Sequence, residues 1–374
     1  MRFVLFVHSL VSDWNHGNAH FLRGVVRALQ ARGHEVRAFE PAAGWSRTQL
    51  LAYQGEIAFR RFARRFPDIR SRTYDLDDLD LEAAIDGADV VLVHEWNEPA
   101  LVTRLGRHRV NGGRHLLLFH DTHHRSVSDP AAMAALPLEG YDGVLAFGAA
   151  VREAYLRQGW ARRVWTWHEA ADVSLFRPDP GQTPEADLVW VGNWGDDERT
   201  AELREFLLEP VRALGLRARV HGVRYPEPAR RALAEAGIDY GGWLANAEVP
   251  RAFARHRVTV HVPRRPYVEA LPGVPTIRVF EALACGIPLV TSPWRDVEGL
   301  FRPGTDFLIA RDGAEMTAAL RAVLADRDLA RHLAASGLET VRSRHTCAHR
   351  ALELLAICRE LGTGEPAGEV QEAS

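Results

Sequence analysis

The sequence predicts an α/β protein built from two doubly wound, Rossmann-like domains. At 374 residues the chain is long for a single hydrophobic core. Apolar runs of strand length alternate with stretches of helical length through both halves, which is typical of parallel sheets covered by helices. Three prolines and a glycine fall within residues 176–184 and separate the halves. We therefore expect the following parts: an N-terminal domain over 1–178, a linker over 179–186, a C-terminal domain over 187–361 and a disordered tail over 362–374.

The first domain opens with a β-α-β unit. Residues 2–7 form a continuous apolar run, as expected for a strand that is covered on both faces. A helix over 17–31 with an apolar stripe follows, and residues 35–39 form a second strand, so the two strands are expected to be parallel. The remaining elements expected here are a long amphipathic helix over 47–66, a helix over 77–86, strands over 89–93, 114–119 and 143–147, a helix over 149–158 and a strand near Val164.

The second domain repeats the alternation of strands and helices, beginning with an apolar strand at 187–191. The last helix is free to pack back on the N-terminal domain. The further elements expected are strands over 218–221, 258–262 and 287–290, a helix over 248–255, a helix that begins at Thr276, and helices over 314–325, 327–344 and 349–361.

Composition excludes several classes of protein. The net charge is −3, whereas a protein that follows nucleic-acid phosphates is usually clearly basic. The 46 basic residues are all arginines, so neither a P-loop lysine nor a Schiff-base lysine exists. P-loop kinases and pyridoxal-phosphate enzymes are thereby excluded. The three cysteines form no C-x-x-C pair, and no apolar run approaches the ~20 residues that span a bilayer, so we expect a soluble, cytoplasmic protein.

The most informative stretch is residues 273–288. Thr276 is a helix N-cap residue behind a proline, and Gly286 followed by Pro288 ends the helix. Only Arg278 and Glu281 are charged, and they share one face. One interpretation is an ion pair at the protein surface. The other is a polar ligand, because free N–H groups of a helix N-terminus bind anions and Glu281 can accept hydrogen bonds from hydroxyls. An anion beside hydroxyls describes a nucleoside diphosphate with its ribose.

Three segments of the second half resemble the donor domain of GT-B glycosyltransferases: PTIRVFEALACGIPLV, GLFRPGTDFLIARD and RHTCAHRALELL. The chain is most similar to the CgeB-like (spore maturation protein) group, which is related to the retaining GT4 enzymes. The resemblance implies a GT-B fold, with two Rossmann-like domains facing a central cleft. In GT4 enzymes the second Glu of an E-x7-E motif holds the ribose. Glu281 matches that Glu, whereas the first position of the motif is Gly273 in this chain.

Other donor-binding candidates follow strands of the second half. Ile277 and Arg278 open the helix behind Thr276, and Arg264 follows the strand at 258–262. After the strand at 187–191, Gly192 permits close backbone approach to a phosphate and Arg199 supplies a fixed positive charge. The resemblance implies a basic residue just after this glycine, but Asn193 stands there. An ordinary turn remains the alternative at both loops.

In the first half, the strand at 114–119 runs into the polar cluster at 120–124. The resemblance implies that a His-Asp pair at this strand end faces the donor sugar, and His120 and Asp121 match it. A metal site and simple loop capping are the alternatives. The loop before the first helix holds Gly17 and Asn18, which are candidates for the donor, although Asn18 could also serve only as a helix cap.

The sequence therefore predicts a hexosyltransferase that moves a sugar from a nucleoside diphosphate, UDP first, to an unidentified acceptor hydroxyl. We expect no cofactor, no metal, no nucleic-acid partner and no transmembrane segment, while peripheral membrane contact stays open. Retention of configuration is implied by the resemblance. Two alternatives are kept: a nucleotide-sugar 2-epimerase on the same fold, and a catalytically silent nucleotide-sugar-binding subunit.

Overall fold

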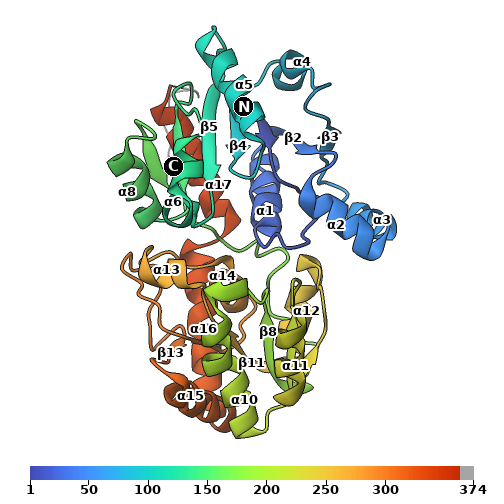
Figure 1. Cartoon of the computed structure of the whole chain (residues 1–374), viewed down its shortest axis with the longest axis vertical. Helices are drawn as coiled ribbons and strands as arrows, with labels where there is room; N and C mark the ends of the chain where they lie inside the picture. Colours follow the sequence, from blue (N-terminus) through green and yellow to red (C-terminus); the bar gives the residue numbers. More distant parts are fainter. Residues whose placement is uncertain (363–374) are drawn as a thin grey trace, which may run out of the picture.

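The computed structural model describes residues 1–362, so nearly all of the tail expected over 362–374 lies outside the described residues. Two lobes are stacked along the long axis of the molecule (Figure 1). Each described lobe contains one fully parallel sheet, of seven strands in the order β3-β2-β1-β4-β5-β6-β7 and of six in the order β10-β9-β8-β11-β12-β13. In both sheets the strand order reverses beside the first strand, as in Rossmann folds, and ligands bind at that reversal beyond the carboxyl ends of the strands.

The N-terminal lobe is formed by residues before the linker. Its strands are β1 (Arg2–Phe6), β2 (Glu35–Pro41), β3 (Arg72–Tyr74), β4 (Val90–His94), β5 (Leu116–Asp121), β6 (Gly143–Ala146) and β7 (Val164–Thr166). Its helices are α1 (Ala19–Gln30), α2 (Trp45–Gln54), α3 (Ile57–Arg65), α4 (Leu81–Ile85), α5 (Pro99–Val110), α6 (Arg125–Ser128), α7 (Pro130–Ala134) and α8 (Ala149–Gln158). Strands β1, β4 and β5 are almost entirely buried, as their apolar runs predict.

The C-terminal lobe repeats this plan. Its strands are β8 (Ala186–Val191), β9 (Ala218–His221), β10 (Ile238–Tyr240), β11 (His256–His261), β12 (Leu289–Thr291) and β13 (Leu308–Ile309). Its helical segments are η1 (Asp196–Glu198), α9 (Thr200–Leu203), the π-helical turn η2 (Arg204–Leu208), α10 (Glu209–Leu214), α11 (Glu227–Glu235), η3 (Asn246–Glu248), α12 (Val249–Ala254), α13 (Arg265–Glu269), α14 (Ile277–Ala284), α15 (Gly313–Ala325), α16 (Arg327–Arg344) and α17 (Cys347–Glu360).

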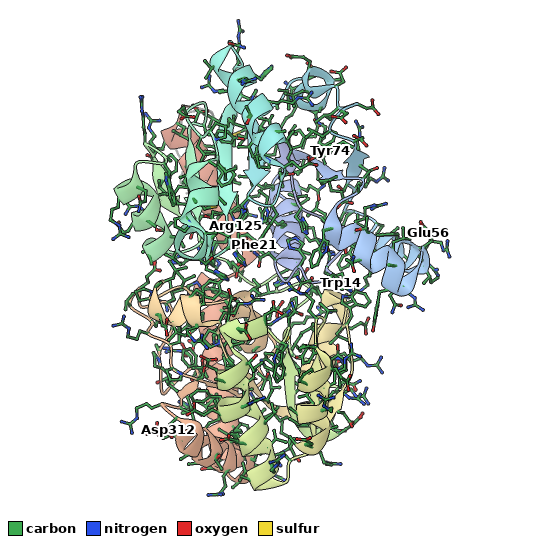
Figure 2. All side chains as sticks on the ribbon, viewed as in Figure 1. Trp14, Phe21, Glu56, Tyr74, Arg125 and Asp312 are labelled. Carbon is green, nitrogen blue, oxygen red and sulfur yellow. The ribbon has the colours of Figure 1, made fainter. Side chains whose placement is uncertain are left out.

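The single long helix expected over 47–66 is wrong. Gly55 has φ 67, which no right-handed helix contains, and the segment divides there into α2 and α3. The pair projects from the side of the N-terminal lobe (Figure 1), and Glu56 marks its outer end (Figure 2). The sequence also left α5 and α11 unassigned, because each carries only a narrow apolar stripe between charged residues.

One hydrophobic cluster joins the lobes. It contains Phe21 of α1, Trp167 and Phe176 of the connecting segment, Phe280 of α14 and Leu354 of α17, all buried. Helix α17 packs along α1, although its sequence follows the C-terminal lobe. The bridge between Ala171 and Thr346 ties the connecting segment to the same place. The lobes thereby meet with the carboxyl ends of their central strands on either side of a cleft.

Candidate active site

A cleft of about 1000 Å³ lies between the two lobes. From the N-terminal lobe it is lined by the loops that follow β1 to β6, and from the C-terminal lobe by the loops after β8, β9, β10 and β11 and the first turn of α14. Trp14, on the loop after β1, lies at the edge of the N-terminal lobe that faces the other lobe (Figure 2). The volume is within the range of ligand pockets in proteins.

The first turn of α14 opens into this cleft. Thr276, Ile277 and Arg278 all line it. Thr276 occupies the N-cap position but makes no capping bond, because its hydroxyl lies 2.9 Å from Nε2 of His261 on β11. A capping side chain would have occupied the free N–H groups of this turn. The turn is therefore open to an anion in the cleft, which would take over the Ile277 N–H from the carboxyl of Glu169.

Glu281 lies one turn behind, in the protein interior. Its side chain is fully buried, does not line the cleft, forms an ion pair with Arg278 and lies 3.0 Å from Nδ1 of His20 on α1. Burial alone would raise the pKa of Glu281, but the charges of Arg278 and His20 hold it below its ordinary value. The ion pair expected as an alternative does form, although its carboxylate is buried. In this conformation Glu281 fixes Arg278 and does not reach a ligand itself.

Glu169 is a second carboxyl group at the same helix turn. It lies on the segment that connects the lobes, is 3% exposed and lines the cleft. Burial raises its pKa well above the ordinary value and the charge of Glu281 adds to the rise, while Arg278 and a hydrogen bond from the Ile277 N–H act against it. Its neighbours thus hold one of the two carboxyls charged and favour a proton on the other.

The C-terminal wall of the cleft is rich in arginine. Arg199 donates to the backbone carbonyls of Asn193 and Val262, and its guanidinium lies 5.1 Å from the ring of Trp190. Burial and then the nearby charge of Arg264 lower the pKa of Arg199 to about 9. Arg264 lines the same wall and is paired with Glu198 at 2.6 Å. These arginines are held by the protein itself, so they present a fixed positive field to the cleft.

Gly192 and Asn193 also line the cleft, directly after β8. The Oδ1 atom of Asn193 accepts a hydrogen bond of 3.0 Å from the N–H of Val223, and its amide donates to Asn15 of the other lobe. Asn193 therefore holds two loops and the two lobes together at the position where the resemblance implied a basic residue. Gly273, by contrast, does not line the cleft. It has φ 88, and a Cβ atom there would lie 2.6 Å from Val297, so a turn and close packing require the glycine.

His120 and Asp121 do not lie where the resemblance placed them. Strand β5 continues to Asp121, and both side chains are fully buried and off the cleft. His120 packs against Trp167 and Phe21, while Asp121 accepts a 2.8 Å hydrogen bond from Tyr155. We therefore revise their expected contact with the donor sugar, since they are positioned to support the strand end and not to touch a ligand.

The next three residues line the cleft in their place: Thr122, His123 and His124. Burial, the neighbouring His124 and then Arg264 lower the pKa of His123 to about 2, so its imidazole is neutral at physiological pH. A neutral imidazole can accept or donate a single hydrogen bond at the cleft.

Gly17 and Asn18 line the cleft on the loop before α1, as do Asp13 and His16. A Cβ atom on Gly17 would lie 3.2 Å from Ile277, so this loop closely approaches the first turn of α14. Asn18 stands at the N-cap position of α1 without a side-chain capping bond. Three atoms on this loop are buried and without a hydrogen-bond partner, namely Oδ1 of Asp13, Nε1 of Trp14 and Nε2 of His16.

Sequence reasoning missed Glu169 and the aromatic lining residues Trp45, Trp96 and Tyr267. For Glu169 one signal existed, since a lone acid between Trp167 and the apolar pair Ala170 and Ala171 stands in a buried segment. Within residues 1–362, no group of three or more His, Cys, Asp or Glu side chains is arranged to hold a metal ion. Metal independence stays a prediction.

Comparisons with known proteins agree with the architecture. Residues 199–356 match the family described as glycosyl transferase-like. Among solved structures, sucrose-phosphate synthase from Thermosynechococcus elongatus is 16% identical, with a TM-score of 0.66 over 96% of this chain and 99% of that chain. Anabaena HepE in complex with UDP-glucose is 13% identical, with a TM-score of 0.69 over 96% of this chain and 100% of that chain. No curated protein matches the sequence significantly.

An α-glucosyltransferase in complex with UDP and a 13-mer DNA is 12% identical, with a TM-score of 0.68 over 96% of this chain and 99% of that chain. The predicted fold class, GT-B with two Rossmann-like domains, is confirmed by these likenesses. The predicted enzyme class, a glycosyltransferase, is supported by the family match together with the fold. Among the described helices, none is both long and apolar enough to cross a membrane.

Proposed function

We propose that the protein transfers a sugar from a UDP-sugar to an acceptor hydroxyl, with the diphosphate held at the first turn of α14. The observation that carries this proposal is the uncapped N-terminus of α14 in the cleft, on the same wall as Arg278 and Arg199. Helix N–H groups and fixed arginines are the phosphate ligands left to a chain without lysine. UDP is the first choice of nucleotide because HepE was solved with UDP-glucose.

The chemistry follows from the charges that line the cleft. When the bond between the anomeric carbon and the diphosphate oxygen breaks, the electron pair stays on the diphosphate. The sugar carbon bonds to the acceptor oxygen, and the proton of that hydroxyl passes to the departing diphosphate. The Ile277 and Arg278 N–H groups and the Arg199 guanidinium would stabilise the growing negative charge without a metal. Glu281 would act as a positioning residue through its buried pair with Arg278.

Retention of configuration, the CgeB-like affiliation and a cytoplasmic location are parts of the same proposal. They rest on the resemblance of residues 275–290 to the GT4 donor motif and on the intracellular character of the cysteine usage. Proton NMR of the product formed from UDP-α-glucose tests retention of configuration. An α-linked product supports retention, and a β-linked product contradicts it.

Phosphate binding at the uncapped N-terminus of α14 is tested by removing one N–H group. Ile277 is the first helical residue, where proline is tolerated, and Thr276 already has the extended backbone that a following proline requires. Ile277→Pro removes the N–H and part of a buried side chain, whereas the control Ile277→Ala truncates the side chain and keeps the N–H. We expect UDP affinity, measured by calorimetry, to fall about tenfold more in Ile277→Pro than in Ile277→Ala, since a charge-assisted hydrogen bond contributes about 1.5–3 kcal/mol. Equal affinities would contradict the phosphate site.

The two alternatives are separated from transfer by product analysis. A 2-epimerase would change the donor sugar with no acceptor present, and a silent subunit would bind UDP while leaving every nucleotide sugar intact. A glycosyltransferase releases UDP, by slow hydrolysis without acceptor and faster with one.

A further inference from the structure

Positive charge is confined to one wall of the cleft, where the one described lining acid, Glu198, is paired with Arg264. Among the described residues that line the cleft, every arginine belongs to the C-terminal lobe: Arg199, Arg224, Arg264 and Arg278. Every charged lining residue from the N-terminal side is a carboxylic acid: Asp13, Asp75, Asp77, Glu98 and Glu169. The positive wall suits the diphosphate of the donor. The opposite wall must then receive the other substrate.

Three of these acids form the rim of the N-terminal wall. Asp75 and Asp77 follow β3, whose last residue, Tyr74, lies high on the N-terminal lobe (Figure 2), and Glu98 precedes α5. All three are exposed, and none has an arginine or histidine within ion-pair distance in the described chain. Arg104 donates to the carbonyls of Leu76 and Leu79 on this loop and does not line the cleft.

Two tryptophans line the cleft from the same lobe as these acids. Trp45 and Trp96 line the same wall and are 44% and 41% exposed, which is unusual for side chains of their size. One face of Trp96 is covered by Arg125 at 4.4 Å, and the rings of Trp14 and Trp45 pack edge to face with centroids 4.9 Å apart. Each indole is thus fixed in place and keeps apolar surface open toward the cleft.

The floor between this rim and α14 has unsatisfied polar atoms. His16 is 7% exposed, lines the cleft, and its Nε2 atom has no hydrogen-bond partner. The buried Oδ1 atom of Asp13 also lacks one. Buried polar atoms without hydrogen-bond partners cost free energy unless a ligand or water satisfies them. A ligand hydroxyl close to the contact between Gly17 and Ile277 would supply such a partner.

We propose that the acceptor is a sugar that carries no negative charge, either neutral or amine-bearing, held against Trp45 and Trp96 with its hydroxyl or ammonium groups toward Asp75, Asp77 and Glu98. Flat apolar surface beside hydrogen-bond acceptors matches a sugar ring, which has C–H groups on its faces and hydroxyls at its edge. The acidic rim disfavours phosphate-bearing acceptors and nucleic acids, because two like charges about 4 Å apart repel by about 1 kcal/mol in water and more near a protein surface. This inference rests on the proposed function, since it places the donor on the opposite wall.

Binding is measured on the full chain saturated with UDP, so that failure of the donor site is seen separately as failure to bind UDP. The ligands are three groups of oligosaccharides, namely neutral, amine-bearing and phosphorylated, and a 13-mer DNA. Binding is followed by tryptophan fluorescence. We expect at least one neutral or amine-bearing sugar to bind about tenfold or more tighter than any phosphorylated sugar or the DNA, and amine-bearing ligands to weaken as salt rises. A phosphorylated sugar or DNA that binds best, or a panel with no binding sugar, would overturn the proposal.

A pair of matched variants locates the effect. Asp77→Arg reverses a charge on the cleft rim, and Asp78→Arg reverses the charge of the adjacent exposed residue that does not line the cleft. We expect Asp77→Arg to lower the affinity for an amine-bearing sugar about tenfold, so that the difference in affinity between amine-bearing and phosphorylated sugars becomes smaller. The affinity for UDP should not change. We expect Asp78→Arg to change the affinity for each of these sugars by less than about threefold. Equal effects of the two variants would contradict the assignment of the acceptor to this rim.

Discussion

At the scale of single residues, the site depends on two carboxyl groups that lie near the first turn of α14 and differ in their favoured protonation state. Glu281 pairs with Arg278 and His20, which favour its ionised form. Glu169 has no such ion pair, and its burial together with the charge of Glu281 favours its protonated form. A protonated Glu169 beside the Ile277 N–H leaves the helix N-terminus positive enough to receive a diphosphate.

This difference predicts how pH affects donor binding. The pKa of Glu169 is raised, so its carboxyl is neutral at low pH and becomes charged as pH rises through that raised pKa. A charged Glu169 repels the diphosphate, and the affinity for UDP-glucose should fall with rising pH by about tenfold or more. UDP-glucose is preferred to UDP because its diphosphate does not itself titrate between pH 5 and 9. Calorimetry across this range measures the effect.

Glu169→Gln stays neutral at every pH, and we expect its affinity for UDP-glucose to be nearly independent of pH and to equal that of the unaltered chain at low pH. Glu98→Gln is the matched control, because Glu98 lines the cleft on the exposed N-terminal rim. It should keep the pH dependence of the unaltered chain. Parallel pH profiles of the Glu169→Gln variant and the unaltered chain would contradict the role of Glu169.

The sequence indicated the turn at Thr276 because a proline, a capping residue and an apolar run follow one another locally. A lone acid in an apolar segment was the one signal for Glu169, and it did not show the contact with Ile277, which arises only from the packing of the connecting segment against another lobe. His120 and Asp121 were misplaced for a related reason. A two-residue extension of β5 decides whether a side chain faces the core or the cleft, and strand ends are poorly specified by sequence.

At the scale of elements, the contact between α1 and α17 holds the C-terminal helix on the N-terminal lobe. Gly24 lies inside α1 at this contact, where a Cβ atom would come within 2.5 Å of Sγ of Cys347 and 2.8 Å of Cβ of Asp172. Glycine weakens a helix interior by about 1 kcal/mol relative to alanine, so close packing accounts for it here. The first turn of α1 also supplies His20, which contacts Glu281.

Gly24→Ala should therefore destabilise the protein despite the better helix propensity of alanine. Overpacking in a rigid core costs about 1–3 kcal/mol, which we expect as a lower melting temperature in thermal denaturation. Gly33→Ala is the control, since Gly33 has φ 80 with open space around it and only backbone strain of about 1 kcal/mol is at stake. A Gly24→Ala variant as stable as the unaltered chain would show that α1 and α17 can separate without cost.

Elements with strong local signals were predictable. Helices α8 and α16 were expected over the residues where they occur, because their caps and periodicity agree. The break at Gly55 was missed, since a glycine inside an amphipathic pattern is compatible with a continuous helix until its neighbours fix φ. The short edge strands β3 and β10 were missed as well, because three residues carry no periodicity and pair only through the sheet.

At the scale of the whole molecule, a few polar contacts hold the lobes closed over the cleft. Glu298 of the C-terminal lobe accepts a 3.0 Å hydrogen bond from the Ala149 N–H at the start of α8, and its other oxygen lies 2.9 Å from Nε2 of His168. The Asn246 N–H donates to Asp13 across the same gap at 3.2 Å. Such contacts are too few to fix one arrangement, and domain motion around a ligand is the usual behaviour of folds with this form.

Glu298→Ala should shift the equilibrium toward an open form, because it removes the contacts with the Ala149 N–H and with His168 at a single position. A hydrogen bond to a charged group contributes about 1.5–3 kcal/mol, enough to change the ratio of open to closed molecules about tenfold. We expect a larger radius of gyration in small-angle X-ray scattering and a higher proportion of UDP-glucose lost to hydrolysis, since an open cleft admits water. Glu315→Ala is the control, because Glu315 pairs with Arg311 within the C-terminal lobe. If Glu298→Ala leaves both the radius and the hydrolysis unchanged, closure is governed by the shared hydrophobic cluster around Trp167 and Phe280, and loosening that cluster would then be required to open the cleft.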